Sequence, residues 1–110
     1  MSFEKRITFE MVRDFPFSSI ESTFTPFGDP FANPIRWLSF TNGTNGLISI
    51  SFDGENDNFI FTPDFLMIVE SRSFSTNEED ASFPIGTQMF IKKIGTVDSG
   101  SFFSTPGFTK

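Results

Sequence analysis

Four carboxylates in the middle of this chain are the residues whose spacing best suggests bound-ion chemistry. Asp53, Glu55 and Asp57 alternate along a polar segment, and Asp64 stands at the twelfth position counted from Asp53. Oxygen ligands at positions 1, 3, 5 and 12 are typical of a calcium-binding loop. The sixth position, where such a loop needs glycine for a sharp turn, is Asn58. The four carboxylates therefore match a calcium-binding loop in their spacing, but the residue at its sharp turn does not match.

The same segment also has a simpler interpretation as a turn between two strands. Asp53-Gly54 is a dipeptide that favours a tight β-hairpin turn. Asp64 replaces the bidentate Glu of a calcium loop, and Pro63 with strand-like flanks replaces its helices. We therefore predict no metal site and no cofactor, and we keep the four carboxylates as metal candidates to be located in the fold.

The side chains that most enzymes rely on are missing from this sequence. It contains no His and no Cys, so a Ser-His-Asp or Cys-His arrangement cannot be built, and disulfides and thiolate zinc sites are excluded. The glycines of Asn42-Gly43-Thr44-Asn45-Gly46 are not followed by the Lys of a phosphate-binding loop. The acidic residues cluster in turns rather than facing each other as a glycosidase pair would. We predict that the chain is not an enzyme.

Net charge restricts the partners. The chain carries a formal charge of −6, whereas nucleic-acid binding needs basic residues to neutralise phosphates and anionic membranes attract basic segments. We expect no nucleic-acid partner and no membrane partner. The beginning of the chain lacks the apolar stretch of a signal peptide, and the missing Cys suits a reducing compartment, so we expect synthesis in the cytoplasm.

Hydrophobic alternation and turn residues predict an all-β fold. About seven short antiparallel strands are expected, and no segment has the period of an amphipathic helix. This spacing predicts a β-sandwich or small barrel formed by a single domain over residues 1–110, with its core sandwich at 35–105. The expected strands cover residues 3–12, 35–41, 47–53, 59–62, 65–72, 87–93 and 101–105.

Three details of strand arrangement follow from local signals. The Asn-Gly pairs between 35–41 and 47–53 predict that these two strands form a hairpin. The strand at 65–72 has apolar residues on both faces, which predicts a central position. Pro106-Gly107 is expected to end the last strand.

Residues 14–34 are predicted to be an extended arm rich in Pro and Phe. Closely spaced prolines forbid a continuous helix there. The chain has 18 Phe, more than a small core needs, and large exposed apolar patches usually mark interaction sites. In one interpretation these Phe residues bind a neighbouring subunit, and in the other they pack over the chain's own core. The candidate interface residues are Phe15, Phe17, Phe24, Phe27, Phe31 and the single Trp, Trp37.

Turn and strand signatures link the span from Trp37 to Ser104 to one group of known proteins. They are the segments Thr41–Asn45, Ile50–Gly54, Phe83–Lys92 and Asp98–Ser101. A hairpin running into a Ser-Phe-Asp-Gly turn, a Pro-x-Gly-Thr strand ending in Lys, and a Ser-Gly-Ser turn into a closing strand occur together in that group. In these features the chain resembles small β-sandwich structural proteins of tailed bacteriophages.

The resemblance implies a virion component present in many copies. It would be a head–tail connector or neck ring subunit, or alternatively a head decoration protein, made in the host cytoplasm and incorporated into the virion. Its partners would be other virion proteins and further copies of itself in a ring. A small carbohydrate- or ligand-binding β-sandwich remains an alternative, in which an exposed Trp37 would contact the ligand.

Overall fold

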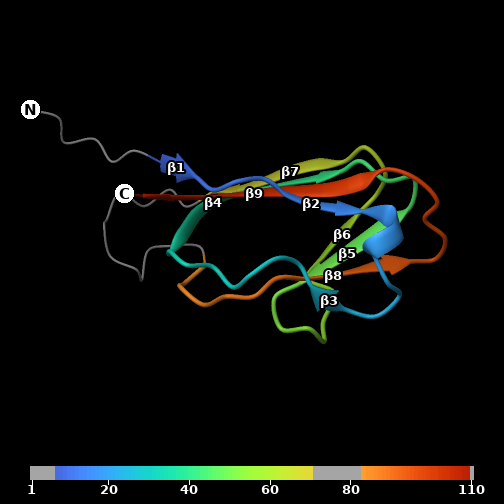
Figure 1. Cartoon of the computed structure of the whole chain (residues 1–110), viewed down its shortest axis with the longest axis horizontal. Helices are drawn as coiled ribbons and strands as arrows, with labels where there is room; N and C mark the ends of the chain where they lie inside the picture. Colours follow the sequence, from blue (N-terminus) through green and yellow to red (C-terminus); the bar gives the residue numbers. More distant parts are fainter. Residues whose placement is uncertain (1–6, 71–82, 110) are drawn as a thin grey trace, which may run out of the picture.

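The computed structural model describes residues 7–70 and 83–109, which form two antiparallel sheets packed face to face (Figure 1). Sheet A has the order β1-β9-β4-β7, with β2 also pairing with β9. Sheet B has the order β3-β8-β5-β6. The all-β sandwich expected from the sequence is confirmed, and the two sheets do not close into a barrel. The strands of sheet A are β1 (Ile7–Phe9), β2 (Arg13–Pro16), β4 (Ile35–Asn42), β7 (Leu66–Glu70) and β9 (Ser101–Thr109); those of sheet B are β3 (Thr25–Pro26), β5 (Leu47–Ser51), β6 (Phe59–Phe61) and β8 (Phe90–Ile94).

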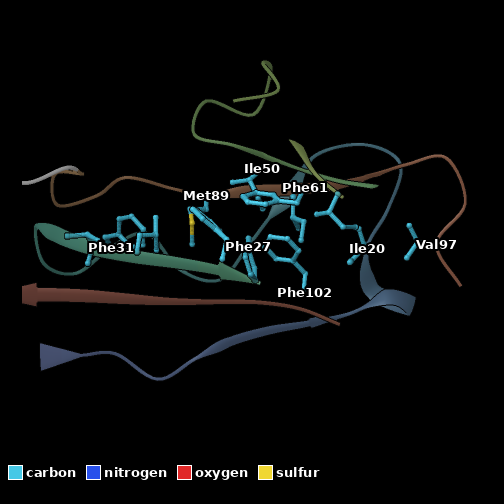
Figure 2. Packing of buried hydrophobic residues seen from close by; sticks show 13 residues of the cluster. Ile20, Phe27, Phe31, Ile50, Phe61, Met89, Val97 and Phe102 are labelled. Carbon is cyan, nitrogen blue, oxygen red and sulfur yellow. The ribbon is translucent and has the colours of Figure 1, made fainter. Parts of the chain in front are cut away.

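The core lies between the sheets and is built from alternate residues of their long strands. Leu38 and Phe40 of β4 and Phe102 of β9 are fully buried from the side of sheet A, and Ile50 and Ile91 meet them from sheet B. Figure 2 shows the buried side chains of this core, which extend from Phe31 at one end to Val97 at the other. Burying alternate residues of each strand explains why the sequence has a period of two rather than a helical period.

The predicted hairpin of 35–41 with 47–53 is wrong. β4 lies in sheet A between β9 and β7, whereas β5 lies in sheet B, so residues 43–46 cross between the sheets. Neither glycine of this segment has positive φ, which a tight hairpin turn would require. They are needed for close approach, because a Cβ on Gly43 would lie 2.7 Å from the Ser101 carbonyl oxygen and one on Gly46 would lie 2.6 Å from that of Thr96.

The central position predicted for 65–72 is also wrong. Among the described strands, β7 pairs only with β4 and forms an edge of sheet A. Met67 and Val69 point to the core, while Leu66 and Ile68 on the other face stay exposed. Apolar residues on both faces therefore mark a strand whose outward face is left uncovered here. Residues 71 and 72 of the prediction lie outside the described part of the chain.

The last strand does not end at Pro106. β9 continues to Thr109 and pairs with β4 throughout, with Leu38 opposite Pro106. Backbone groups alternate in direction along an antiparallel strand, and the Pro106 carbonyl accepts a hydrogen bond from the Glu10 N–H, away from β4. The missing N–H of Pro106 therefore faces the gap between β1 and β2, where it costs no ladder hydrogen bond. The strand expected over 3–12 is interrupted at this gap; residues 3–6 lie outside the described part of the chain.

Candidate interaction surface

The outward side of sheet A carries a set of large apolar side chains. The register aligns outward positions across four strands, from Leu66 on β7 through Thr41 on β4 and Phe103 on β9 to Asp14 on β2. The next outward row contains Ile68, Ser39 and Thr105, and the third contains Glu70 and Trp37. We call the apolar members of these rows, together with the adjacent Phe9, the outer apolar face: Phe9, Trp37, Leu66, Ile68 and Phe103.

The members of the outer apolar face are open to solvent. Leu66 and Ile68 are 59% and 51% exposed, and Phe9 and Phe103 are 55% and 36% exposed. Trp37 is half-buried because the ring of Phe9 packs against it edge-on, with ring centroids 5.0 Å apart. Leu66 and Ile68 adjoin on β7, and Phe9 adjoins Trp37, while Thr41 of β4 stands between Leu66 and Phe103. Several large exposed apolar side chains on one side of a sheet are typical of an interaction site.

The polar groups of this face are small or acidic. Ser39, Thr41 and Thr105 occupy the outward positions between the apolar side chains. Asp14 and Glu70 stand at outward register positions on opposite edges of sheet A. The face therefore offers an apolar surface with hydroxyl groups inside it and a negative charge at two of its borders.

The outward side of sheet B is arranged differently, because the chain covers the outward positions of its strand β5 at Ser49 and Ser51. The loop 52–58 folds back so that Asp57 accepts a hydrogen bond from the Ser49 hydroxyl and pairs with Lys92, whose Nζ lies 3.3 Å from the Asp57 carboxylate. The same Nζ lies 4.5 Å from the ring centroid of Phe24, and Ser49 and Ser51 on β5 are buried although they point outward. Sheet B still exposes Ile60 and Leu47, so the larger set of exposed apolar side chains, rather than all of them, lies on sheet A.

The four metal candidates are not brought together. No group of three or more acidic residues that could hold a metal ion occurs among the described residues. Asp53 accepts hydrogen bonds from the Ser51 hydroxyl and from the backbone N–H groups of Glu55 and Asn56, so its carboxylate caps its own turn. Asp64 occupies the turn between β6 and β7 with a φ of 65°.

These hydrogen bonds favour the ionised form of both loop carboxylates. The pKa of Asp53 is held well below its ordinary value, first by the backbone N–H of Asn56 and then by that of Glu55. The pKa of Asp57 is also lowered, mainly by the Ser49 hydroxyl and additionally by Lys92. As the alternative interpretation proposed, Asp53-Gly54 lies in the turn that joins β5 to β6, and Gly54 has a φ of 78°.

The Phe residues of 14–34 divide between the core and the surface. Phe27 and Phe31 are buried in the chain's own core, and Phe15 packs against it with its ring centroid 5.5 Å from that of Phe27. Phe17 is exposed and Phe24 is half-buried beneath Lys92. Of the six candidate interface residues, only Trp37 lies on the outer apolar face.

Arg13 attaches this segment to sheet A. Its Nη1 donates hydrogen bonds to the carbonyl oxygens of Phe27 and Asp29 at 3.0 and 2.8 Å, and its guanidinium lies 5.0 Å from the ring centroid of Phe31. Nη2 lies 3.4 Å from Glu10 Oε1. The residues expected to form an arm are therefore held against the sandwich by this half-buried cation, together with backbone hydrogen bonds such as those from Phe27 to Met89 and from Phe31 to Thr87.

Sequence reasoning did not identify Phe9, Leu66, Ile68 or Phe103 as surface residues. Alternation along the strand expected over 3–12 predicts that Phe9 faces inward, and the apolar residues on both faces of 65–72 predict a central strand; Phe9, Leu66 and Ile68 are exposed instead. The sequence did contain one signal. Residues 65–72 are apolar on both faces, whereas the outward residues Ser39 and Thr41 of the neighbouring strand are polar. If another layer covered this side of the sheet, the outward residues of both strands would be expected to be apolar.

Comparisons with known proteins do not name a relative. No family model, curated protein or solved structure matches this chain. In the described part of the chain, no helix has the length and apolarity that crossing a membrane requires.

Proposed function

We propose that this protein is a non-catalytic structural subunit that packs against other protein subunits through the outer apolar face. The observation that carries the proposal is the exposure of Leu66, Ile68, Phe9 and Phe103 on one side of one sheet. Sheet B, whose outward side is partly covered by the chain itself and exposes fewer large apolar side chains, provides the internal comparison. The larger exposed apolar surface, on sheet A, is available for a partner.

The size of the face fits a subunit contact. Four neighbouring strands spaced about 4.8 Å apart, each contributing about five residues of about 3.3 Å, span on the order of 300 Å² in projection. The accessible area of a side-chain surface exceeds its projection. The projected area includes the polar positions of the face, and it is about two fifths of the roughly 800 Å² per partner of a standard interface.

The assembly that we propose is the virion of a tailed bacteriophage, with the protein as a multi-copy head–tail connector or neck ring subunit. The support is the resemblance of the segments Thr41–Asn45, Ile50–Gly54, Phe83–Lys92 and Asp98–Ser101. Contacts between unlike surfaces of identical copies close into rings, and a rigid sandwich with one apolar sheet surface is suited to such contacts. A head decoration protein would use the same kind of face, and its partner would be a shell subunit.

Light scattering over a range of concentrations tests the proposal. Phe103 lies on the central strand β9, so Phe103→Lys places a charge within the face without touching a sheet edge. We expect the natural protein to form a discrete oligomer and Phe103→Lys to shift it to a smaller species, because the contacts made through this face are lost. The matched control is Ile85→Lys, because Ile85 is exposed in a turn outside the strands.

Trp37 provides an independent readout. As the single Trp on the outer apolar face, it should shift its emission to shorter wavelength when a partner excludes water from the face. A protein that stays monomeric to about 1 mM, where a contact would supply only about 4 kcal/mol, would overturn the proposal. Equal association of the Phe103→Lys and natural proteins would overturn the assignment to this face.

A ligand-binding role is the second candidate, and one feature favours it. Trp37 and Phe9 form an aromatic corner, and Glu70 is the residue opposite Trp37 on β7. Aromatic rings beside a carboxylate are able to contact a sugar. Titration of Trp37 fluorescence with a glycan panel tests this role; quenching that is lost in Glu70→Gln supports it, and an unchanged signal at millimolar glycan removes it.

A further inference from the structure

The free edge of sheet A is formed by β7, and it differs from the other sheet edges of the described chain. β7 has five residues, contains neither Pro nor Gly, and carries a single charge at its end, Glu70. The other edges are interrupted or short. β2 ends in Pro16, β3 is the dipeptide Thr25–Pro26, and β1 and β6 have three residues each. Proteins usually block exposed edges with prolines, bulges or short strands, and β7 has none of these.

The register shows which backbone groups of β7 are left without a strand partner. Asn42 exchanges hydrogen bonds with the residues just before β7, since its N–H donates to the Phe65 carbonyl and its carbonyl accepts from the Asp64 N–H. Backbone direction alternates along a strand, so Phe40 and Leu38 also face β7, opposite Met67 and Val69. The N–H and C=O groups of the intervening residues, Leu66, Ile68 and Glu70, therefore point away from sheet A.

We propose that β7 pairs antiparallel with β7 of a second copy of this chain, with Ile68 opposite Ile68 on the two-fold axis. This register places Leu66 opposite Glu70 of the other copy and gives all three outward-directed residues a backbone partner. The two Glu70 carboxylates then lie about 13 Å apart along the strands, farther than the Debye length of about 8 Å at physiological salt. The two copies form one continuous sheet across the axis.

A second copy fits this edge better than a strand of unrelated sequence for two reasons. The five-residue strand is complementary to itself in the centred register, and shifting by two residues would leave an outward-directed residue unpaired on each copy. The pairing also puts the exposed Leu66 and Ile68 side chains beside those of the other copy, so that the outer apolar faces of the two subunits become one surface. The inference deepens the proposed function, on which it rests, by naming one of the partners.

Cysteine cross-linking tests the contact directly, because the natural chain has no Cys. Opposed residues in a hydrogen-bonded antiparallel pair have Cα atoms about 5.5 Å apart, within the range of a disulfide. With oxidised glutathione as the oxidant, Ile68→Cys should form a disulfide dimer at least about tenfold faster than Ile60→Cys. Ile60 is the matched control, since it is 55% exposed on β6 of the other sheet.

The register has its own test. Leu66→Cys alone and Glu70→Cys alone should each cross-link slowly, because identical positions are separated by about 13 Å in the proposed pairing. A mixture of the two variants should form the mixed disulfide rapidly. Cross-linking of each variant with itself at the rate of the mixture would overturn the register, and an Ile68→Cys rate no higher than that of Ile60→Cys would overturn the contact.

A backbone variant checks the contact without a covalent bond. Ile68→Pro removes the outward N–H and leaves the hydrogen bonds to β4 in place, so the fold, monitored by circular dichroism, should survive while the dimer dissociation constant rises by about tenfold or more. Unchanged dimerisation would overturn the inference. Phe103→Lys should leave the Ile68→Cys cross-link intact, so failure of the outer-face proposal and failure of this inference give different results.

Discussion

Asn42 is the side chain whose loss should be most costly relative to its size. It is fully buried at the end of β4, where the chain leaves sheet A. Its Nδ2 donates to the carbonyl oxygens of Gly46 and Phe61 at 2.9 and 3.0 Å, and its Oδ1 accepts from the N–H and hydroxyl of Thr44 at 3.0 and 2.6 Å. One amide thus links sheet A, the crossover and β6 of sheet B.

The substitution Asn42→Leu keeps the approximate volume and removes all four hydrogen bonds. The Thr44 hydroxyl is able to turn to the Gly46 carbonyl, 3.2 Å away. The Thr44 N–H and one accepting site of the Phe61 carbonyl lose their partner, and each unsatisfied buried group costs about 1–3 kcal/mol. We expect a loss of roughly 2–5 kcal/mol in the free energy of unfolding, which at about 4 °C per kcal/mol lowers Tm by roughly 8–20 °C.

Urea unfolding followed by circular dichroism measures this loss. The control is Asn33→Leu, since no hydrogen bond of the Asn33 side chain is seen in the described structure and its loss should stay within about 0.5 kcal/mol. In a second variant, Asn42→Asp, a carboxylate oxygen takes the place of Nδ2 and faces the carbonyl oxygens of Gly46 and Phe61. Burial there raises the pKa of the new carboxyl, so this variant should regain stability as the pH falls. A cost below about 1 kcal/mol for Asn42→Leu would refute the reasoning.

Two further outcomes follow from the contacts of Arg13 and Asp53. Arg13→Met removes both hydrogen bonds to the carbonyl oxygens of Phe27 and Asp29 but keeps an apolar side chain; we expect a loss of about 2–3 kcal/mol in urea unfolding and faster proteolysis near residue 28, whereas Asp14→Asn should change neither. The lowered pKa of Asp53 contributes stability at neutral pH that is lost as the pH falls below about 4, so the Tm difference between the natural protein and Asp53→Asn should shrink in acid; a difference independent of pH would contradict this.

The parts of the fold that the sequence predicted correctly depend on local alternation. In 47–53 and 87–93 alternation predicts inward positions for Ile48, Ile50, Met89 and Ile91, and all four are fully buried. Alternation is a property of a single strand and the sheet it belongs to, so it specifies which side chains point inward. It does not specify which strand pairs with which.

The predictions of strand pairing and of the last strand's end were wrong where one residue type can serve two structural purposes. Asn-Gly predicts a hairpin when glycine supplies positive φ, yet Gly43 and Gly46 are present because the crossover lies against residues 96–101, and a Cβ would not fit. Pro106 predicts a strand end because it lacks an N–H, yet that missing donor faces the gap between β1 and β2. In both cases the residues that determine the structure lie far away in the sequence, so the local pattern could not indicate them.

The candidate site was missed for a related reason. The surplus of Phe in the composition indicates an interaction surface but does not locate it. The prolines of 14–34 favoured that segment as its location. Prolines in fact let 14–34 cross from sheet A to sheet B without an α-helix or a long ladder, so that Phe27 and Phe31 enter the core. Of the exposed Phe residues in the described chain, Phe9 and Phe103 lie on strands of sheet A, and Phe17 and Phe65 lie outside the strands.

The contrast between the covered Ser49 and Ser51 of β5 and the exposed Leu66 and Ile68 of β7 argues that this exposure is functional. Ser49 and Ser51 are buried on the outward side of sheet B because a loop carboxylate, Lys92 and Phe24 close over them. The chain thus spends a whole loop on covering two serines, while Leu66 and Ile68 stay in water at an edge strand that lacks the usual blocks to pairing. Each exposed aliphatic side chain forgoes on the order of 1.5–3 kcal/mol of burial. A partner that covers the outer apolar face would recover this free energy, and a second copy paired through β7 would provide part of that cover.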